Sequence, residues 1–306
     1  MLLGIITAVM WQTKVSIVGL GLMGGSLALA IRLAQRSGQQ PLPQLPFPAH
    51  ITIVDTDAQT RQAAARLADV VTADFAEGVR EAELVILATP VRTVLALLEK
   101  LAEVRPQGCM VLDLGSTKRD ICAAMAALPE GFEALGGHPM CGKETGGFGS
   151  ATPDLYRDKT FVLCRTDRTS ERVEQTVLDL LRIVGAKPLF LPPEVHDEMV
   201  AAISHLPYVA AGSLMRTAAA LADDRLWTVS ASGFRDTSRV SGTDSRMMLD
   251  ILLTNKTAVL QQLRRYQDEI TAVTALLEEG DEMALAAWLA QTQQAYAAYR
   301  KKKDEG

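Results

Sequence analysis

The sequence predicts an α/β domain followed by an all-helical domain. Short apolar runs alternate with helical segments, as they do when parallel strands are covered by helices on both faces. A glycine-rich turn joins the first apolar run to the first helix, and only helical patterns follow Pro192 and Pro193. We therefore expect an α/β domain over residues 14–192 and a helical domain over 193–306, with residues 1–13 as a leader outside the fold.

Composition excludes several classes of protein. The 306 residues are 48% hydrophobic, enough for a sizeable core, and the net charge of −5 argues against nucleic-acid binding. No apolar run reaches the roughly 20 residues of a membrane span. The four cysteines, Cys109, Cys122, Cys141 and Cys164, lack the spacing of a metal site. We expect reduced, mostly buried cysteines, no metal and a cytoplasmic location. For Cys141, three residues from His138, a role beyond packing stays open.

The first strand and its turn predict a dinucleotide site. The apolar run 15–18 is followed by Gly19-Leu20-Gly21-Leu22-Met23-Gly24 and a helical segment, the context of a Rossmann fingerprint. Gly19 makes the tight turn, Gly21 admits the pyrophosphate and Gly24 lets helix and strand pack closely. Leu22 and Met23 open the helix whose free N–H groups would bind the phosphates. The alternative is a tight turn without a ligand.

The second strand, Ile51–Val54, predicts the choice of cofactor. Asp55 ends this strand, where an acidic side chain accepts hydrogen bonds from the ribose hydroxyls and repels a 2′-phosphate. A proline-rich insert, Pro41–Pro48, explains its distance from the glycines, and no arginine follows it directly. The sequence thus favours NAD over NADP. The alternative is that Asp55 only caps the next helix.

Further strands bring polar residues to one edge. The expected strands are 70–71, 84–88, 110–114, 134–136, 161–164 and 189–191, with helices such as 91–104, 119–128 and 170–184 between them. Thr89 and Pro90 follow one strand, and Ser116 follows another. Because ligands bind beyond the carboxyl ends of parallel strands, we expect these residues to share one site with Gly19 and Asp55.

The stretch Gly136–Glu144 predicts a proton acceptor. It holds His138, one of only four histidines, which Pro139 restrains to an extended conformation. An imidazole held rigidly at a strand end can take a proton near neutral pH. Taken alone, a His-Pro pair between glycines is more typical of a turn.

The region after Pro193 predicts helices over 194–222, 226–240, 246–277 and 281–300, with an irregularity at Pro207. These helices carry more apolar residues than one small bundle needs to bury, which favours a homodimer formed through them. His196 and His205 lie nine residues apart, on opposite sides of a regular helix, so we interpret His196 as structural.

Three polar segments complete a recognisable pattern. They are Gly137-His138-Pro139-Met140, Ser204-His205-Leu206-Pro207 and Gly233-Phe234-Arg235-Asp236-Thr237-Ser238-Arg239. Together with the glycine turn they resemble the prephenate and arogenate dehydrogenases of tyrosine biosynthesis, and the last segment is most similar to the cyanobacterial-type arogenate enzymes. The resemblance runs from Lys14 to the last helices. It implies an NAD(P)-dependent oxidative decarboxylation of prephenate or L-arogenate.

The resemblance also implies roles for single residues. His138 would accept the proton of the substrate's C4 hydroxyl, and Ser116 would orient that hydroxyl; a helix N-cap is the alternative for Ser116. Arg239 would hold a substrate carboxylate with Asp236 in the same segment, or would only pair with Asp236. His205 would contact substrate and Glu144 would gate the pocket, unless Glu144 is a solvated loop residue. The role of Lys118 is open between the cofactor and a local ion pair.

Two departures from the family pattern leave the substrate open. Met248 stands where some relatives have a tryptophan, and Lys143 replaces a small residue. With no appended regulatory domain expected, any inhibition by L-tyrosine would act at the active site. The alternatives are another two-domain 3-hydroxyacid dehydrogenase or imine reductase, and a non-catalytic dinucleotide-sensing module.

Overall fold

The computed structural model describes residues 13–36, 48–143 and 145–304. The chain forms two compact units, residues 1–255 and 256–306. Most of the predicted leader and of the proline-rich insert lies outside the described residues, while Thr13 is already the first residue of a strand.

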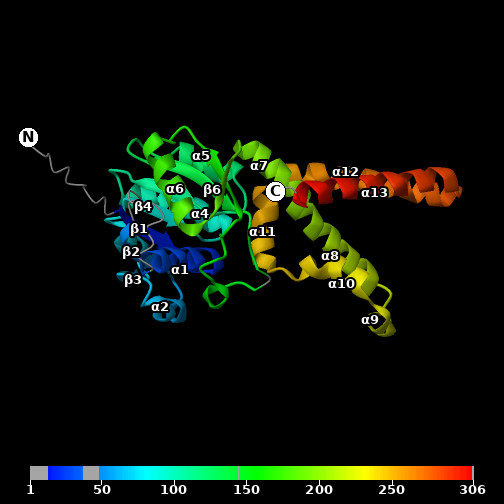
Figure 1. The fold of residues 1–306 in the computed structure, drawn as a ribbon, viewed down its shortest axis with the longest axis horizontal. Helices are drawn as coiled ribbons and strands as arrows, with labels where there is room; N and C mark the ends of the chain where they lie inside the picture. Colours follow the sequence, from blue (N-terminus) through cyan, green and yellow to red (C-terminus); the bar gives the residue numbers. More distant parts are fainter. Residues whose placement is uncertain (1–12, 37–47, 144, 305–306) are drawn as a thin grey trace, which may run out of the picture. The chain divides into compact units, whose positions relative to one another are not determined.

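The first unit is built on one eight-stranded sheet with the order β3-β2-β1-β4-β5-β6-β7-β8 (Figure 1). The strands are β1 (Thr13–Val18), β2 (Pro48–Val54), β3 (Val70–Thr72), β4 (Leu84–Leu87), β5 (Met110–Asp113), β6 (Glu133–Pro139), β7 (Thr160–Arg165) and β8 (Lys187–Phe190). Strands β1 to β6 are parallel. This arrangement, with crossover helices between the strands, confirms the predicted Rossmann-type α/β fold.

The last two strands correct the prediction of an all-parallel sheet. Strand β7 runs antiparallel to β6, and β8 is parallel to β7. The β6–β7 connection contains no long crossover helix among its described residues, only the short η1 (Phe148–Ser150), so the chain returns in the opposite direction. His138 therefore lies inside β6, opposite Val162 of β7, and not beyond the strand end.

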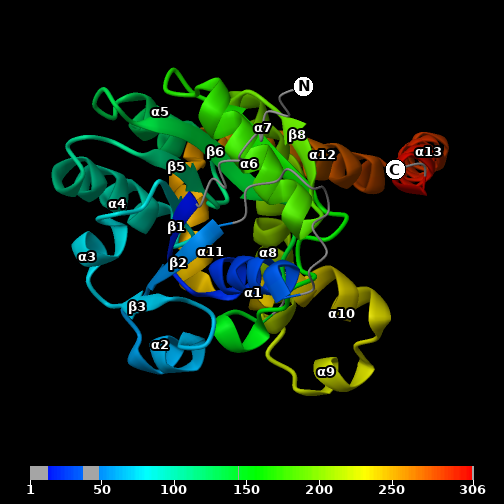
Figure 2. The same cartoon turned by 60° about the vertical axis from the view of Figure 1, so that its left-hand side comes forward.

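Helices cover both faces of this sheet (Figure 2). They are α1 (Leu22–Arg36), α2 (Ala58–Ala64), α3 (Phe75–Val79), α4 (Val91–Val104), α5 (Arg119–Ala126) and α6 (Glu171–Val184). Ile31 of α1 and Val177 of α6 belong to the core on one face, and Leu98 of α4 and Met125 of α5 to the core on the other. The burial of these apolar helix faces holds the strand ends in place.

The remaining helices of the first unit follow β8. They are α7 (Pro193–Val200), the π-turn η2 (Ala201–His205), α8 (Leu206–Ala219), α9 (Arg225–Val229), α10 (Ser232–Ser238), η3 (Arg239–Gly242) and α11 (Ser245–Thr254). The π-turn ends two residues before Pro207, where the sequence predicts an irregularity and where proline has no N–H to donate. The single helix predicted over 226–240 is broken into shorter pieces.

The second unit consists of α12 (Lys256–Glu279) and α13 (Glu282–Asp304), which pack on each other. Gly280, with a φ of 68°, makes the turn between them. The helix predicted over 246–277 is thus two helices separated at Asn255. Among the described residues, no helix is long and apolar enough to cross a membrane.

Candidate active site

The glycine turn is shaped partly by packing and partly by open space. Gly19 has a φ of 92°, and a Cβ there would meet the Ala88 carbonyl and Thr89. A Cβ on Gly24 would overlap the carbonyl of Gly19, which explains the close approach of α1. A Cβ on Gly21, by contrast, would meet no atom within 4 Å. Internal packing therefore gives no reason for glycine at this position, whereas the close approach of a pyrophosphate does.

Asp55 connects the end of β2 to this turn. Its Oδ2 accepts a hydrogen bond from the Leu20 N–H at 2.7 Å, and its Oδ1 accepts one from the Asp57 N–H at 2.8 Å. The cap of α2 is Asp57, which accepts the Thr60 N–H at 2.7 Å. The alternative that Asp55 caps this helix is therefore wrong. Its carboxylate lies against the glycine turn and keeps lone pairs for further donors.

Thr89 and Pro90 follow β4 beside the turn. The Thr89 hydroxyl is buried and has no hydrogen-bond partner among the described residues. Pro90 stands at the N-cap of α4 without a side-chain cap bond. On the other side of the turn, Met23 in α1 accepts a hydrogen bond through its carbonyl from the Tyr156 hydroxyl at 2.6 Å. A buried, unpaired hydroxyl beside the glycine turn fits a site for a polar cofactor.

Asp113 and Lys118 form an ion pair buried between β5 and α5. Both side chains have no exposed surface, and the Lys118 ammonium donates to Asp113 Oδ2. Asp113 also accepts the N–H groups of Gly115 at 2.8 Å and Gly137 at 3.0 Å. Of the two roles left open for Lys118, the structure shows the local ion pair. The pair links the end of β5 to β6 one residue before His138.

Ser116 does not cap α5. The first N–H groups of that helix are bound by Asp197: Oδ1 accepts from Lys118 at 2.7 Å and Oδ2 from Arg119 at 2.9 Å. The Ser116 side chain has no hydrogen-bond partner among the residues that the structure describes. The capping alternative is thus wrong, and its hydroxyl is available to a ligand.

His138 begins a chain of three side chains. Its Nδ1 lies 2.8 Å from Nε2 of His196, and Nδ1 of His196 lies 2.8 Å from Oδ1 of Asp197. Strand β6 and helix α7, which carry these residues, lie side by side in both views (Figures 1 and 2). The His196 and Asp197 side chains are each 1% exposed. The interpretation of His196 as structural does not include its contact with His138. The one available sequence signal is that a histidine and an aspartate stand next to each other early in a helix.

The π-turn and Asn255 bring His205 into the same network. Asn255 Nδ2 donates to the Asp197 carbonyl at 2.7 Å and lies 3.2 Å from Nδ1 of His205. Because the wider turn at 201–205 changes the helical phase, His205 does not point away from His196 as a regular helix would require. No local pattern distinguishes Asn255, because helical patterns continue on both sides of it.

Burial favours the neutral forms of His138 and His205. It disfavours the imidazolium form of His138, and His196, Lys118 and His205 add repulsion, so that the pKa of His138 lies well below 6.5. Burial also lowers the pKa of His205 to about 4, against an opposing effect of Asp197. For Asp197, burial alone would raise the pKa. Hydrogen bonds from His196 and from the Arg119 and Lys118 N–H groups outweigh burial and hold the pKa of Asp197 below 3.8.

The predicted carboxylate-binding residues lie on other elements. Asp236 on α10 is exposed and pairs with Arg235 at 3.0 Å. Arg239 opens η3, which packs on α8. Glu144 lies outside the described residues. Lys143 donates to the Ser150 carbonyl at 2.7 Å. The contacts shown do not join Asp236 or Lys143 to the histidines, so their roles stay predictions.

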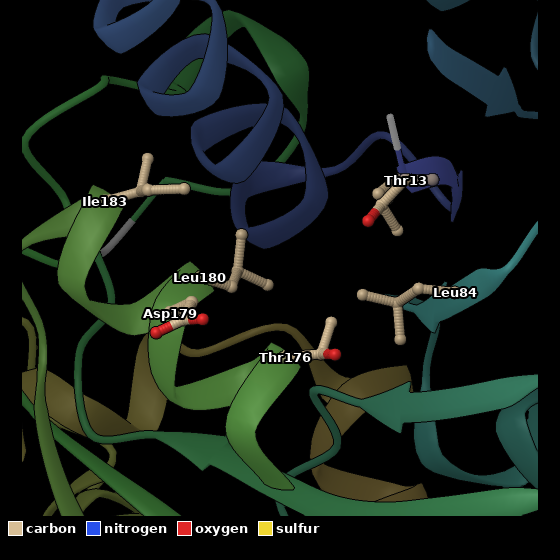
Figure 3. Close-up of a pocket in the computed structure, with 7 residues that line it drawn as sticks. Thr13, Leu84, Thr176, Asp179, Leu180 and Ile183 are labelled. Atoms are coloured by element: carbon tan, nitrogen blue, oxygen red, sulfur yellow. The ribbon is translucent and has the colours of Figure 1, made fainter. Parts of the chain in front are cut away.

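A separate pocket lies at the opposite edge of the sheet (Figure 3). It is formed by the amino-end residues of β1 and β4 and by α6, and its lining residues are Thr13, Val15, Leu84, Thr176, Asp179, Leu180 and Ile183. The carboxylate of Asp179 is already engaged by Gln175 and Arg182. None of the predicted site residues lines this pocket, so it forms no part of the candidate site.

Comparison with known proteins identifies the family. The nucleotide-binding domain of prephenate dehydrogenase matches residues 44–189, and the dimerization domain of prephenate dehydrogenase matches residues 192–291. The prephenate dehydrogenase of Bacillus subtilis is 32% identical over 280 residues, which cover 88% of this chain and 71% of the relative. The chain belongs to the prephenate dehydrogenase family. The resemblance seen in the sequence is confirmed, and the protein is an NAD(P)-dependent oxidoreductase.

Two solved structures of this family match almost the whole chain. The arogenate dehydrogenase of Synechocystis is 30% identical with a TM-score of 0.76, covering 94% of this chain and 100% of that one. The Aquifex aeolicus prephenate dehydrogenase in complex with hydroxyphenyl propionate and NAD+ is 26% identical with a TM-score of 0.81, covering 94% and 98%. The predicted domain limit at 192/193 lies beside the junction of the two family matches and stays a prediction.

Proposed function

We propose that this member of the prephenate dehydrogenase family oxidatively decarboxylates a cyclohexadienol substrate: prephenate, L-arogenate or both. One observation carries the proposal: His138 is held neutral at the carboxyl edge of the sheet, with its Nε2 free of partners among the described residues. A neutral imidazole with one free nitrogen is suited to accept the proton of a hydroxyl group. The names of the relatives, prephenate and arogenate dehydrogenase, supply the substrate class.

The chemistry assigns a task to each residue. His138 takes the proton of the C4 hydroxyl, and the Ser116 hydroxyl orients that group. Arg239 holds a substrate carboxylate with its planar guanidinium. As the C4 carbon is oxidised, the bond from the ring to its carboxylate breaks, CO2 leaves and the ring becomes a phenol. A bound nicotinamide would supply the hydride acceptor, held by the turn of Gly19, Gly21 and Gly24 and by Asp55 and Thr89.

Asp55 supports NAD as the preferred cofactor, because its carboxylate at the glycine turn would repel a 2′-phosphate. We expect Asp55→Ala to lower kcat/KM for NAD by at least tenfold, about 1.4 kcal/mol, and to leave the value for NADP unchanged or raised. Steady-state kinetics with both cofactors measures this. Asp57→Ala, which removes only the cap of α2, is the matched control and should keep the cofactor ratio. An unchanged ratio in Asp55→Ala would remove the ribose assignment.

The proposed role of Arg239 is to bind a carboxylate of the substrate. We expect Arg239→Gln to raise KM for the substrate by about 10- to 100-fold, the loss of a charged hydrogen bond of about 1.5–3 kcal/mol, with a smaller effect on kcat. The control is Arg225→Gln on α9, an exposed arginine paired with Asp223. An equal KM effect in both variants would show that general surface charge, and not a specific anchor, is measured.

The proposed activity is tested by a two-by-two assay. Prephenate or L-arogenate is combined with NAD or NADP, and the reduced nicotinamide is read by absorbance. Turnover of either substrate supports the proposal, and the ratio gives the preference. Cofactor binding without turnover would indicate a dinucleotide-sensing module. Turnover of a 3-hydroxyacid or reduction of an imine in its place would indicate a related reductase.

We further propose a homodimer formed through the C-terminal helices, and an active-site action for any inhibition by L-tyrosine. Several apolar side chains of α12 and α13 are exposed, among them Ile270, Leu277, Leu289 and Tyr296. The dimerization-domain match includes most of these helices. Light scattering at several protein concentrations reports the assembly.

A further inference from the structure

Two successive hydrogen bonds, from His138 to His196 and from His196 to Asp197, bear on which ring nitrogen of His138 carries the hydrogen. We propose that His196 and Asp197 are positioning residues that hold His138 in the tautomer with hydrogen on Nδ1, so that Nε2 is the proton acceptor. This inference deepens the proposed function, since it specifies which nitrogen of the proposed base reacts. It rests on the two contacts of 2.8 Å and on the burial of both positioning side chains.

The order of donors and acceptors follows from Asp197. An ionised carboxylate only accepts hydrogen bonds, so the hydrogen between Asp197 and His196 must be on Nδ1 of His196. With that hydrogen on Nδ1 of His196, Nε2 of the same ring is the acceptor toward His138. The hydrogen between the two rings must therefore be on Nδ1 of His138, which leaves Nε2 of His138 unprotonated.

Contacts from three parts of the chain keep the Asp197 carboxylate in place as the acceptor for His196. Its two oxygens accept the Lys118 and Arg119 N–H groups at the start of α5, and its own carbonyl accepts from Asn255. The carboxylate thus has donors on both oxygens, and burial leaves no water to replace His196. Contacts from α5, from α7 and from Asn255 thus select one tautomer of His138 on β6.

The same contacts stabilise the product of proton transfer. When His138 Nε2 accepts a proton, Nδ1 still donates to His196, and the negative charge of Asp197 lies at the end of the chain. The positive charge is thereby partly balanced in a site where Lys118 opposes it. A positioning role of this kind affects kcat more than substrate binding.

The direct test is the nitrogen spectrum of the whole protein with 15N-labelled histidine rings, at a pH above 7. The chain has only four histidines, so single substitutions assign every signal. We expect His138 to show a protonated Nδ1 and an unprotonated Nε2. A His138 ring protonated on Nε2 would overturn the proposal without any activity measurement. His50→Gln, at a residue on β2, is the control and should leave the His138 signals unchanged.

Two His196 variants separate positioning from simple packing. His196→Leu removes the acceptor, and we expect kcat to fall by about 10- to 100-fold with KM nearly unchanged, as for other partners that orient a histidine. It should also lose the fixed Nδ1–H tautomer of His138. His196→Gln carries a carbonyl that can accept from His138 Nδ1, and we expect it to recover most of the kcat and the tautomer.

The outcomes also separate this inference from the proposed function. Turnover of a cyclohexadienol together with a His196→Leu variant that keeps kcat and the His138 spectrum would overturn the positioning role alone. An Nδ1–H tautomer without turnover of any cyclohexadienol would overturn the substrate and leave the positioning role. If His196→Leu does not fold, the spectrum of the unmodified protein decides.

Discussion

His138→Asn is expected to lower kcat by about 10²- to 10⁴-fold, the contribution of a positioned general base. Binding of NAD, measured by calorimetry or fluorescence, should change little, because the contacts of His138 are to His196 and β7 and not to the glycine turn. His50→Asn is the matched control and should keep full activity. A near-normal kcat in His138→Asn would exclude this residue as the base.

The pH profile gives the sign of the same effect. The neutral ring is the active form, and the pKa of His138 lies well below 6.5 because burial and neighbouring positive charge disfavour its protonation. The rate of the unmodified protein should therefore stay level as the pH falls to 6.5 and decline only as the pH passes through that lowered value. The residual rate of His138→Asn should lack this decline.

Lys118→Met is expected to lower the free energy of unfolding by about 3–5 kcal/mol, because it leaves the Asp113 carboxylate buried without its cation. Chemical denaturation measures the loss. The variant also removes a positive charge that lowers the pKa of His138, so the acid limb of the rate profile should move to higher pH. Both effects arise from one buried ammonium group.

The comparison for Lys118 is Lys14→Met, which breaks an ion pair with Glu81 that is largely exposed. Solvent screens such pairs, and stability should change little. Equal losses in both variants would mean that burial of the Asp113–Lys118 pair adds nothing, which would contradict its place in the core.

The parallel part of the sheet follows directly from local sequence. Strand β4 and helix α4, for example, were predicted within one residue of their limits, because a run of apolar residues and a 3.6-residue apolar period each identify one element. The direction of β7 could not be predicted in this way, since a buried strand is apolar on both faces whichever way it runs. Direction depends on the length and structure of the connection before it.

Single residues of the candidate site can be predicted from the sequence, but the contacts that join them cannot. Motif residues such as His138, Ser116 and Asp55 are conspicuous in the sequence, whereas Asp197 and Asn255 act through contacts to residues far away in the chain. His205 does not lie where its nine-residue spacing from His196 predicts, because that prediction requires a regular helix. A π-turn at 201–205 has no clear local signature apart from the proline that follows it.

The antiparallel pairing of β7 with β6 restricts the motion of the proposed base, His138. Strand β6 is paired with β5 only as far as Leu135, whereas its pairing with β7 continues through His138, opposite Val162. Amides in such a strand exchange with solvent only in rare, large openings of the fold. The backbone that carries the proposed base, His138, therefore moves little during the reaction. Motions that admit the substrate and release the product must come from the elements that face this strand.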